Sequence, residues 1–143
     1  MMNLHKILDD LKHDGCRITK IRQGILVLLT KSQQPLSSLN IQNHLSKKNI
    51  NVNKTTVYRE LEFLKKKLLI LELKFDDKIN RYEINSIHHH HIVCIKCKVA
   101  KCIELTENLE QQEKLIEKNN KFKIISHSLE FYGLCHNCNT LAK

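Results

Sequence analysis

Two pairs of closely spaced cysteines are the strongest chemical signal in the sequence. Cys94 and Cys97 form one C-x-x-C pair, and Cys135 and Cys138 form a second. Two such pairs supply four thiolates, which complete the tetrahedral shell of Zn²⁺ and leave no open position for water or substrate. Residues 98–134 exceed the roughly 15 to 20 residues that separate the pairs of a compact zinc ribbon. We therefore predict a structural zinc site that closes a folded domain.

Four consecutive histidines precede the first cysteine pair. His88, His89, His90 and His91 are internal, and the strand-like Ile92-Val93 follows them. Successive side chains of an extended strand point to opposite faces. His89 and His91 therefore form one chelating pair and His88 and His90 another, so two separate metal sites are possible.

Two further residues are candidate ligands for these pairs. Glu83, near the end of a predicted strand, lies within plausible reach of His89 and His91. His127 belongs to the alternating segment 125–131 and can serve the second pair. The alternative for His127 is a histidine satisfied within the core.

The charge of the chain is unevenly placed. The 24 Lys and Arg residues against 15 Asp and Glu give +9, of which residues 1–84 carry +7 and residues 85–143 carry +2. Clustered positive charge gains from releasing the counterions condensed on nucleic acid. The first part is therefore a candidate polyanion-binding module, and the alternative is a basic surface that only keeps the chain soluble.

Cysteine and histidine are divided the other way. Five of the six Cys and six of the nine His follow residue 84. The N-terminus lacks the apolar core of a secretory signal, and no run approaches the ~18 apolar residues of a membrane span. We expect a cytoplasmic protein without membrane contact, whose paired cysteines bind metal rather than form disulfides.

Helical periodicity dominates residues 1–68. The predicted helices begin near Leu4, near Ile21, at a Ser37 or Ser38 cap and at an Asn53 cap, and Gly15 ends the first. The last of these helices carries a stripe of apolar residues, Val57, Leu61, Leu64 and Leu68. The runs 69–75 and 80–84 flank a polar turn and predict a hairpin. Helices followed by a hairpin indicate a winged helix.

The helix after Asn53 is the candidate recognition helix. Lys54, Arg59 and residues 65–67 supply cations for DNA phosphates. A plain amphipathic surface helix is the alternative for this segment alone. Residues 105–116 predict another helix, and residues 125–131 a strand. The predicted fold is α/β (α+β), with a winged-helix DNA-binding domain over 1–84 and an α/β dimerisation and metal-binding domain over 85–143.

Several motifs resemble one family over essentially the whole chain. The chain resembles the ferric uptake regulator (Fur) family of bacterial metal-responsive repressors. The motifs that carry this resemblance are RITKIR at 17–22, TVYR at 56–59, RYE at 81–83, HHHHIVCIKC at 88–97 and HSLEFYGLC at 127–135.

The resemblance implies a homodimer that binds a palindromic double-stranded DNA operator when a regulatory metal is present. By position, Tyr58 and Arg59 would face DNA from the recognition helix, with Thr55 and Thr56 at its start and Arg22 in support. The chain would be a transcriptional repressor of metal-uptake genes, with metal as corepressor.

The resemblance also implies the composition of the metal sites. The four cysteines of the C-x-x-C pairs would hold the structural zinc. The regulatory site would comprise Glu83, His89, His91 and a ligand after the first cysteine pair. The second site would comprise His88, His90, His127 and an acid from the following helix, Glu110.

The sequence departs from the family pattern at the regulatory site. The position five residues after Cys97, usually Asp or Glu, is Cys102, and Glu104 follows two residues later. The place where some iron and peroxide sensors supply a histidine reads Gln34-Pro35-Leu36, and the usual Gly after the first pair is Lys98. A thiolate favours Zn²⁺ over oxygen-loving ions. We expect zinc, as in the zinc-uptake regulator (Zur) branch, with Fe²⁺ and Glu104 as the alternative.

Two other classes compete with a regulator. A zinc hydrolase or nucleobase deaminase would need signatures such as H-E-x-x-H or H-x-E with P-C-x-x-C, which the sequence lacks. A zinc-buffering protein would explain the His/Cys-rich half but not the TTVYR segment with its basic flanks. We expect no enzyme and no catalytic residues.

Overall fold

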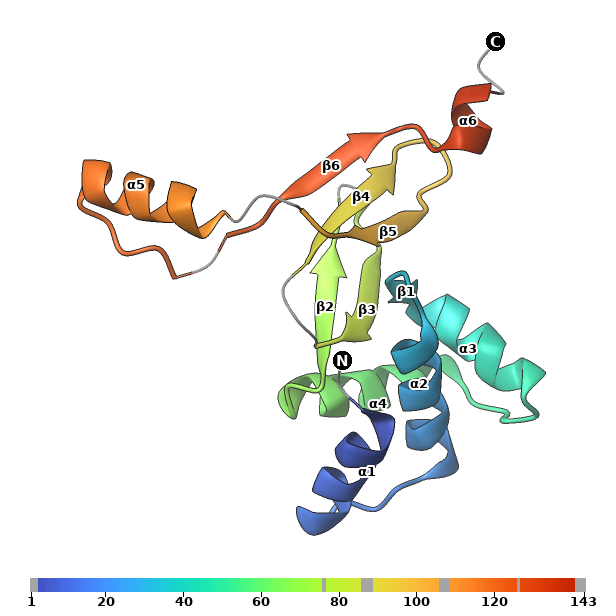
Figure 1. Ribbon diagram of the computed structural model, residues 1–143. Coiled ribbons are helices and arrows are strands. Elements are labelled where there is room, and N and C mark those ends of the chain that lie inside the picture. Colours follow the sequence, from blue (N-terminus) through green and yellow to red (C-terminus); the bar gives the residue numbers. More distant parts are fainter. Residues whose placement is uncertain (1–2, 76, 86–88, 106–108, 126, 141–143) are drawn as a thin grey trace. The chain divides into compact units, whose positions relative to one another are not determined.

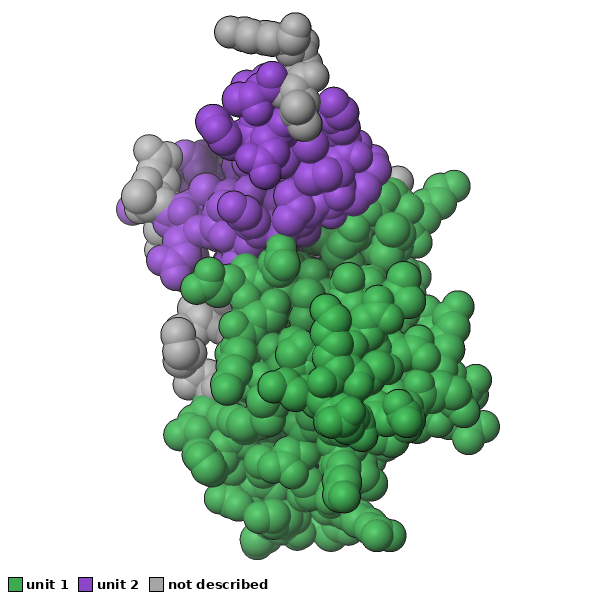
Figure 2. Space-filling view, turned by 90° about the vertical axis from the view of Figure 1, so that its right-hand side faces the viewer, with its two compact units in different colours: residues 1–87 green, residues 88–143 purple. Residues whose placement is uncertain are grey.

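The chain divides into two units, Met1–Ile87 and His88–Lys143, in a computed structural model that describes residues 3–75, 77–85, 89–105, 109–125 and 127–140 (Figures 1 and 2). The division follows residue 87, within a few residues of the domain boundary that the sequence indicates after residue 84. No helix in the described part of the chain has the length and apolar character needed to cross a membrane.

The elements of unit 1 are α1 (Leu4–His13), α2 (Lys20–Lys31), β1 (Leu36–Ser37), α3 (Ser38–Lys47), α4 (Lys54–Lys66), β2 (Ile70–Lys74) and β3 (Asn80–Ile84). Those of unit 2 are β4 (His90–Cys94), β5 (Ala100–Ile103), α5 (Glu110–Asn120), β6 (Glu130–Gly133) and α6 (His136–Thr140). Each unit thus holds helices and one sheet, which confirms the predicted mixed fold.

Every helix of unit 1 begins at a polar residue that caps it. The residue before the helix accepts a backbone N–H bond through its side-chain oxygen, as in Asn53, which accepts from Thr56 over 2.8 Å. Such a cap stabilises a helix by about 1 kcal/mol. Asn3, Thr19 and Ser37 cap the other three helices in the same way. The expected cap at Asn53 is therefore confirmed, and of the two candidates Ser37 and Ser38 it is Ser37 that caps α3.

A continuous apolar core fills unit 1. Helices α1 to α4 gather at one end of the β2–β3 hairpin (Figure 1). Burial of each such side chain stabilises the fold by about 2 kcal/mol. The core consists of Ile7, Leu11, Ile25, Leu26, Leu29, Ile41, Leu45, Val57, Leu61, Leu64, Ile70, Tyr82 and Ile84.

The sheet of unit 1 forms the wing. Its strand order is β1-β3-β2, and both pairings are antiparallel. The guanidinium of Arg81 bonds the Asp77 carboxylate over 2.5 Å and lies 5.3 Å from the ring centroid of Phe75. These contacts fix the turn between β2 and β3.

Unit 2 is built around the central strand β4. β5 pairs with β4 antiparallel and β6 pairs with it in parallel, so the strand order is β5-β4-β6. Helix α5 projects away from this sheet in Figure 1, and none of its residues is buried. Apolar packing contributes little to the position of α5.

Several expected elements differ from the structure. Leu68 does not continue the α4 stripe, because the helix ends at Lys66 and Leu68 adopts a left-handed φ of 56° with 73% of its surface exposed. Helix α5 begins at Glu110, after Leu105. The strand expected over 125–131 is only β6, so His127 lies before it. The sequence did not suggest β1, β5 or α6.

Candidate metal centres and nucleic-acid interface

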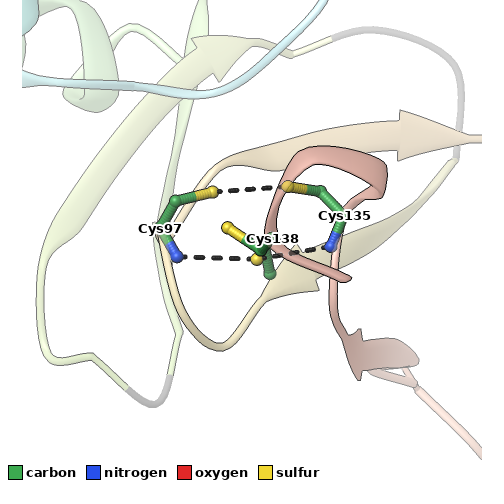
Figure 3. A group of neighbouring side chains, drawn as sticks. Cys97, Cys135 and Cys138 are labelled. Atoms are coloured by element: carbon green, nitrogen blue, oxygen red, sulfur yellow. Dashed lines mark hydrogen bonds between the residues drawn. The ribbon is translucent and has the colours of Figure 1, made fainter. Parts of the chain in front are cut away.

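Four cysteines meet in unit 2. Cys94 ends β4 and Cys97 lies in the turn before β5, while Cys135 and Cys138 come from the start and middle of the α6 segment. Their sulfur atoms all lie within 4.8 Å of one another. Figure 3 shows the side chains of Cys97, Cys135 and Cys138 pointing toward one another. The structure thus brings together all four residues of the predicted structural site.

The spacing of these sulfur atoms fits zinc. A Zn–S bond of about 2.3 Å in a regular tetrahedron requires sulfur atoms about 3.8 Å apart. The Sγ atoms of Cys97 and Cys135 are 3.7 Å apart. The backbone N–H groups of Cys97 and Cys135 also donate to Cys94 Sγ over 3.5 and 3.4 Å, which orients that ligand. The residues therefore fit a closed, four-coordinate zinc site.

The thiols of this cluster have opposite tendencies to ionise. Backbone hydrogen bonds, first from Cys135 and then from Cys97, lower the pKa of Cys94 to about 6. A side-chain hydrogen bond with Cys135, followed by burial, raises the pKa of Cys138 to about 12. At neutral pH one thiolate is already available, while Cys138 must lose a proton to bind a metal ion.

The turn after the first cysteine pair carries a residue that is unusual for its conformation. Lys98 has φ of 62°, and its N–H donates to the carbonyl of Cys94 over 2.9 Å. Glycine adopts this left-handed conformation without the steric cost of a Cβ. The turn closes around the site despite the lysine.

A second cluster of ligands lies on one face of the β4–β5 pair. His91 is directly opposite Cys102 across the two strands, and the rings of His89 and His91 are 4.9 Å apart. The ligand atoms of His89, His91 and Cys102 lie within 4.8 Å of one another. Glu104 follows the end of β5 with an exposed side chain and does not belong to this cluster.

The remaining residue expected at this site belongs to unit 1. Glu83 lies in β3, opposite Leu71 of β2. It precedes the connection between the units by only a few residues. Unit 2 alone therefore offers two imidazoles and one thiol to a metal ion.

The opposite face of β4 carries a third group. The ring of His90 stacks on that of His127, with centroids 5.4 Å apart. Nδ1 of His127 is 2.6 Å from Oε1 of Glu113. His127 is exposed rather than part of the core. His88, the other expected ligand, lies outside the described residues.

Glu113 is a carboxylate beside His127 that the sequence did not single out. Glu110 was the expected acid, and it begins α5. Glu113 follows one turn later on the same side of the helix, since residues three apart are neighbours on a helical surface. Glu113 is therefore a further candidate ligand beside Glu110.

The exposed face of α4 carries most of the expected DNA contacts. Thr55, Tyr58 and Arg59 are exposed and Thr56 is partly so, while Val57 and Leu61 anchor the opposite face in the core. Neither Arg59 nor Lys54 forms an ion pair with any residue that the structure describes. This face therefore offers cations and hydroxyl groups to a polyanion.

Other cations expected to contact phosphates are engaged within unit 1. Lys65 bonds Glu62 and Glu72, and Lys67 bonds Asp14 over 2.9 Å. The hydrogen bond with Lys65 is the main cause that lowers the pKa of Glu72. These pairs fix the C-terminal end of α4 to the wing and to the end of α1.

Arg22 faces the interior of unit 1 rather than solvent. Its Nε bonds Glu60 of α4 over 2.9 Å, its Nη1 bonds the Arg17 carbonyl over 2.6 Å, and its guanidinium lies 3.8 Å from the centroid of the Phe63 ring. These contacts hold α4 against α2. Arg22 thus helps to orient the candidate recognition helix through contacts with Glu60 and Phe63, away from its exposed face.

Comparisons with known proteins agree on one family. Residues 13–132 match the sequence profile of the ferric uptake regulator family. The ferric uptake regulation protein of Bacillus subtilis is 33% identical over 141 residues, which cover 95% of this chain and 94% of that protein. The peroxide-responsive repressor PerR of Staphylococcus epidermidis is 31% identical over 136 residues, with coverages of 94% and 89%.

A solved structure shows the same likeness. The Helicobacter pylori ferric uptake regulator, reported to have three functional metal-binding sites, matches with a TM-score of 0.83 at 29% identity. The match covers 96% of this chain and 95% of that one.

Proposed function

Because this chain belongs to the ferric uptake regulator family, we propose that it is a zinc-responsive repressor of metal-uptake genes. Members of the family are metal-responsive transcriptional regulators and not enzymes, so the hydrolase and buffering alternatives are set aside. The proposal places the protein in the cytoplasm with its operator DNA.

The position of Cys102 is the observation that favours zinc as the regulatory metal. Its thiol lies within 4.8 Å of the ligand nitrogens of His89 and His91. Two imidazoles, one thiolate and a carboxylate make a four-coordinate set that suits zinc, and a soft sulfur ligand disfavours ions that prefer oxygen. We assign Glu83 as the carboxylate. Glu104, exposed beyond β5, is the alternative oxygen ligand if iron is the signal.

This ligand set would link the two units. Glu83 belongs to the winged helix and the other three ligands belong to the second unit. A bound ion would therefore restrict the connection between units, and its binding energy would favour arrangements in which both recognition helices of a dimer meet DNA about one helical turn apart. Protons compete for these ligands, so acid should weaken operator binding.

A homodimer is supported by the surface of unit 2. Ten large apolar side chains are exposed in the described part of unit 2, and gathered exposed apolar side chains are typical of interaction sites. These residues are Ile92, Ile95, Leu105, Leu115, Ile116, Phe122, Ile125, Phe131, Tyr132 and Leu134. We propose that a second copy covers part of this surface and that the dimer binds a palindromic operator.

The other assignments follow the clusters already described. The four cysteines of the C-x-x-C pairs would hold a structural zinc ion. His88, His90 and His127, with Glu110 or Glu113, would form the second site. Thr55, Thr56, Tyr58 and Arg59 would contact the operator, and Arg22 would contribute by orienting α4.

A paired titration tests the choice of metal. The reduced protein, with its cysteine site filled, is titrated with Zn²⁺ or Fe²⁺ while operator binding is followed at fixed salt. Zinc should switch on binding at free concentrations far below those of iron. Cys102→Glu should reduce that preference by at least about tenfold, because a carboxylate replaces the thiolate.

Control measurements separate this site from the cysteine cluster. Zinc content near one tightly bound equivalent per chain must persist in Cys102→Glu. If Fe²⁺ switched binding on while zinc filled only the cysteine cluster, the protein would be an iron-responsive regulator, as the name of its Bacillus subtilis relative suggests.

A further inference from the structure

One hydroxyl pair joins the start of α3 to the exposed face of α4. Ser38 Oγ donates a hydrogen bond to the Tyr58 hydroxyl over 3.0 Å. Ser38 is the first residue of α3, and Tyr58 lies in the second turn of α4. Among the residues that the structure describes, Ser38 is the hydrogen-bond partner of this phenol.

Helix α3 does not need the Ser38 hydroxyl for its own start. The preceding Ser37 caps the helix, and Ser37 and Asn40 form a reciprocal capping box. Ser38 is therefore available to bond outside its own helix. Its contribution to helix stability is small, which separates its role from that of the cap.

Ser38 and Tyr58 both belong to helices whose backbone is held in place by the core. Ile41 and Leu45 of α3 and Val57 and Leu61 of α4 are fully buried. The distance between the two helices at this point is therefore set by packing. A side chain held between two fixed backbones loses its rotational freedom before any ligand arrives, which lowers the entropy cost of binding.

The side chain of Tyr58 remains accessible to a ligand despite this bond. The residue is 37% exposed, and the ammonium of Lys54 lies 5.7 Å from its ring centroid. Because the phenol oxygen accepts from Ser38, its own proton remains to be donated. Most hydrogen bonds between protein and DNA go to phosphate and sugar oxygens.

We propose that Ser38 is a positioning residue for DNA binding, whose hydroxyl holds the Tyr58 phenol so that the phenol O–H donates to a phosphate oxygen of the operator. The proposal rests on the proposed role of α4 in operator binding. Ser38 itself does not touch DNA and acts only through Tyr58.

A double-mutant cycle tests this dependence. The probe is a duplex selected by the zinc-loaded wild-type protein from a random pool, measured at several salt concentrations. Tyr58→Phe should lower affinity about 10-fold and Ser38→Ala about 5-fold, in keeping with the loss of neutral hydrogen bonds. The double variant should lose about 10-fold rather than 50-fold, because Ser38 has nothing to position once the phenol is gone.

Two further measurements distinguish positioning from a general structural role. Ser38→Thr keeps the hydroxyl and should restore affinity, and Ser46→Ala, a change of an exposed serine on the same helix, should not alter it. The slope of log affinity against log salt should remain that of wild type in Ser38→Ala, because a neutral donor releases no counterions.

Three outcomes would overturn the proposal. These are a Ser38→Ala effect that is as large in the Tyr58→Phe variant as in wild type, wild-type affinity in Ser38→Ala, and wild-type affinity in Tyr58→Phe. In each case zinc-dependent selection of DNA by the wild-type protein would still support the regulator function. Failure of the wild-type protein to select any duplex would instead overturn the function and this proposal together.

Discussion

The two units obtain their structure from different forces. Unit 1 encloses thirteen buried apolar side chains in one cluster, whereas the buried residues of the described part of unit 2 that are apolar or sulfur-containing are Val93, Cys94, Ala100 and Cys138. Two of these four are candidate zinc ligands. Burial can account for the order of unit 1 whatever the metal supply, whereas we expect ligand clusters to contribute most of the order of unit 2.

Removal of the structural metal should produce the largest difference in stability between the two units. Chelation, or Cys138→Ser, should destabilise unit 2 by on the order of 10 kcal/mol, because metal binding supplies its folding free energy. Hydrogen exchange of the whole chain should show lost protection in β4, β5 and β6 while α2 to α4 keep theirs. Cys16→Ser, a change in unit 1 outside the cluster, is the control. Equal loss of protection in both units would contradict the contrast.

Acid should affect the units unequally. Zinc must displace the Cys138 proton, and the Cys94 thiolate is itself protonated below pH about 6. At fixed free zinc, a change from pH 7.5 to 5.5 should cost unit 2 about 3 kcal/mol for the Cys138 proton and less for Cys94, whose thiol is ionised over most of that range.

Unit 1 should retain its stability over the same range. The pKa of Glu72 is lowered below its ordinary value of 4.5, chiefly by its hydrogen bond with Lys65. The contribution of that carboxylate is present above the ordinary value and is lost only as pH falls through the lowered one. Thermal unfolding at both pH values measures the two transitions, and a matching drop in unit 1 would mean that its stability also depends on protons in this range.

A core truncation should show the reverse pattern. Leu61→Ala removes a fully buried side chain and should destabilise unit 1 by about 3 kcal/mol. Denaturant unfolding measures the loss, and zinc content should not change. Leu39→Ala removes a leucine that is 62% exposed and should stay within about 0.5 kcal/mol of wild type. Loss of zinc in Leu61→Ala would show that the core of unit 1 also supports the metal site.

The smallest effect concerns the turn beside the cysteine cluster. Lys98→Gly should stabilise zinc-loaded unit 2 by about 0.5 kcal/mol, because relief of the left-handed backbone exceeds the added entropy of the unfolded chain. The matched control is Lys96→Gly in the same turn, where the lysine backbone is not left-handed and the change should destabilise. A gain of stability in Lys96→Gly would show that relief of the left-handed backbone is not the cause of the stabilisation.

Local signals explain how much of the fold the sequence could predict. Asn53 and Ser37 cap helices through bonds to residues three positions away, and the C-x-x-C spacing is equally local. The mixed fold and the family are confirmed. Strand β5 could not be anticipated, since Lys101 and Cys102 lack strand-like alternation and their order comes from pairing with β4.

Some of the side chains that meet at the candidate sites could not be predicted from local sequence patterns. The approach of Glu113 to His127 depends on where α5 begins and how the following loop returns. The inward position of Arg22 depends on Glu60, which is distant in sequence. In each case the partner is chosen by tertiary packing.

The alternation of β4 has a consequence for how this protein can evolve. His89 and His91 serve one face of the strand and His90 the other. A shift of one residue in strand register exchanges the faces of all side chains. In one direction such a shift would put His88 and His90 in the places of His89 and His91, and in the other direction it would put His90 and Ile92 there. The repeat could therefore keep two imidazoles at the proposed regulatory site after a slip in one direction but not in the other, so it tolerates only half of the register errors open to the strand.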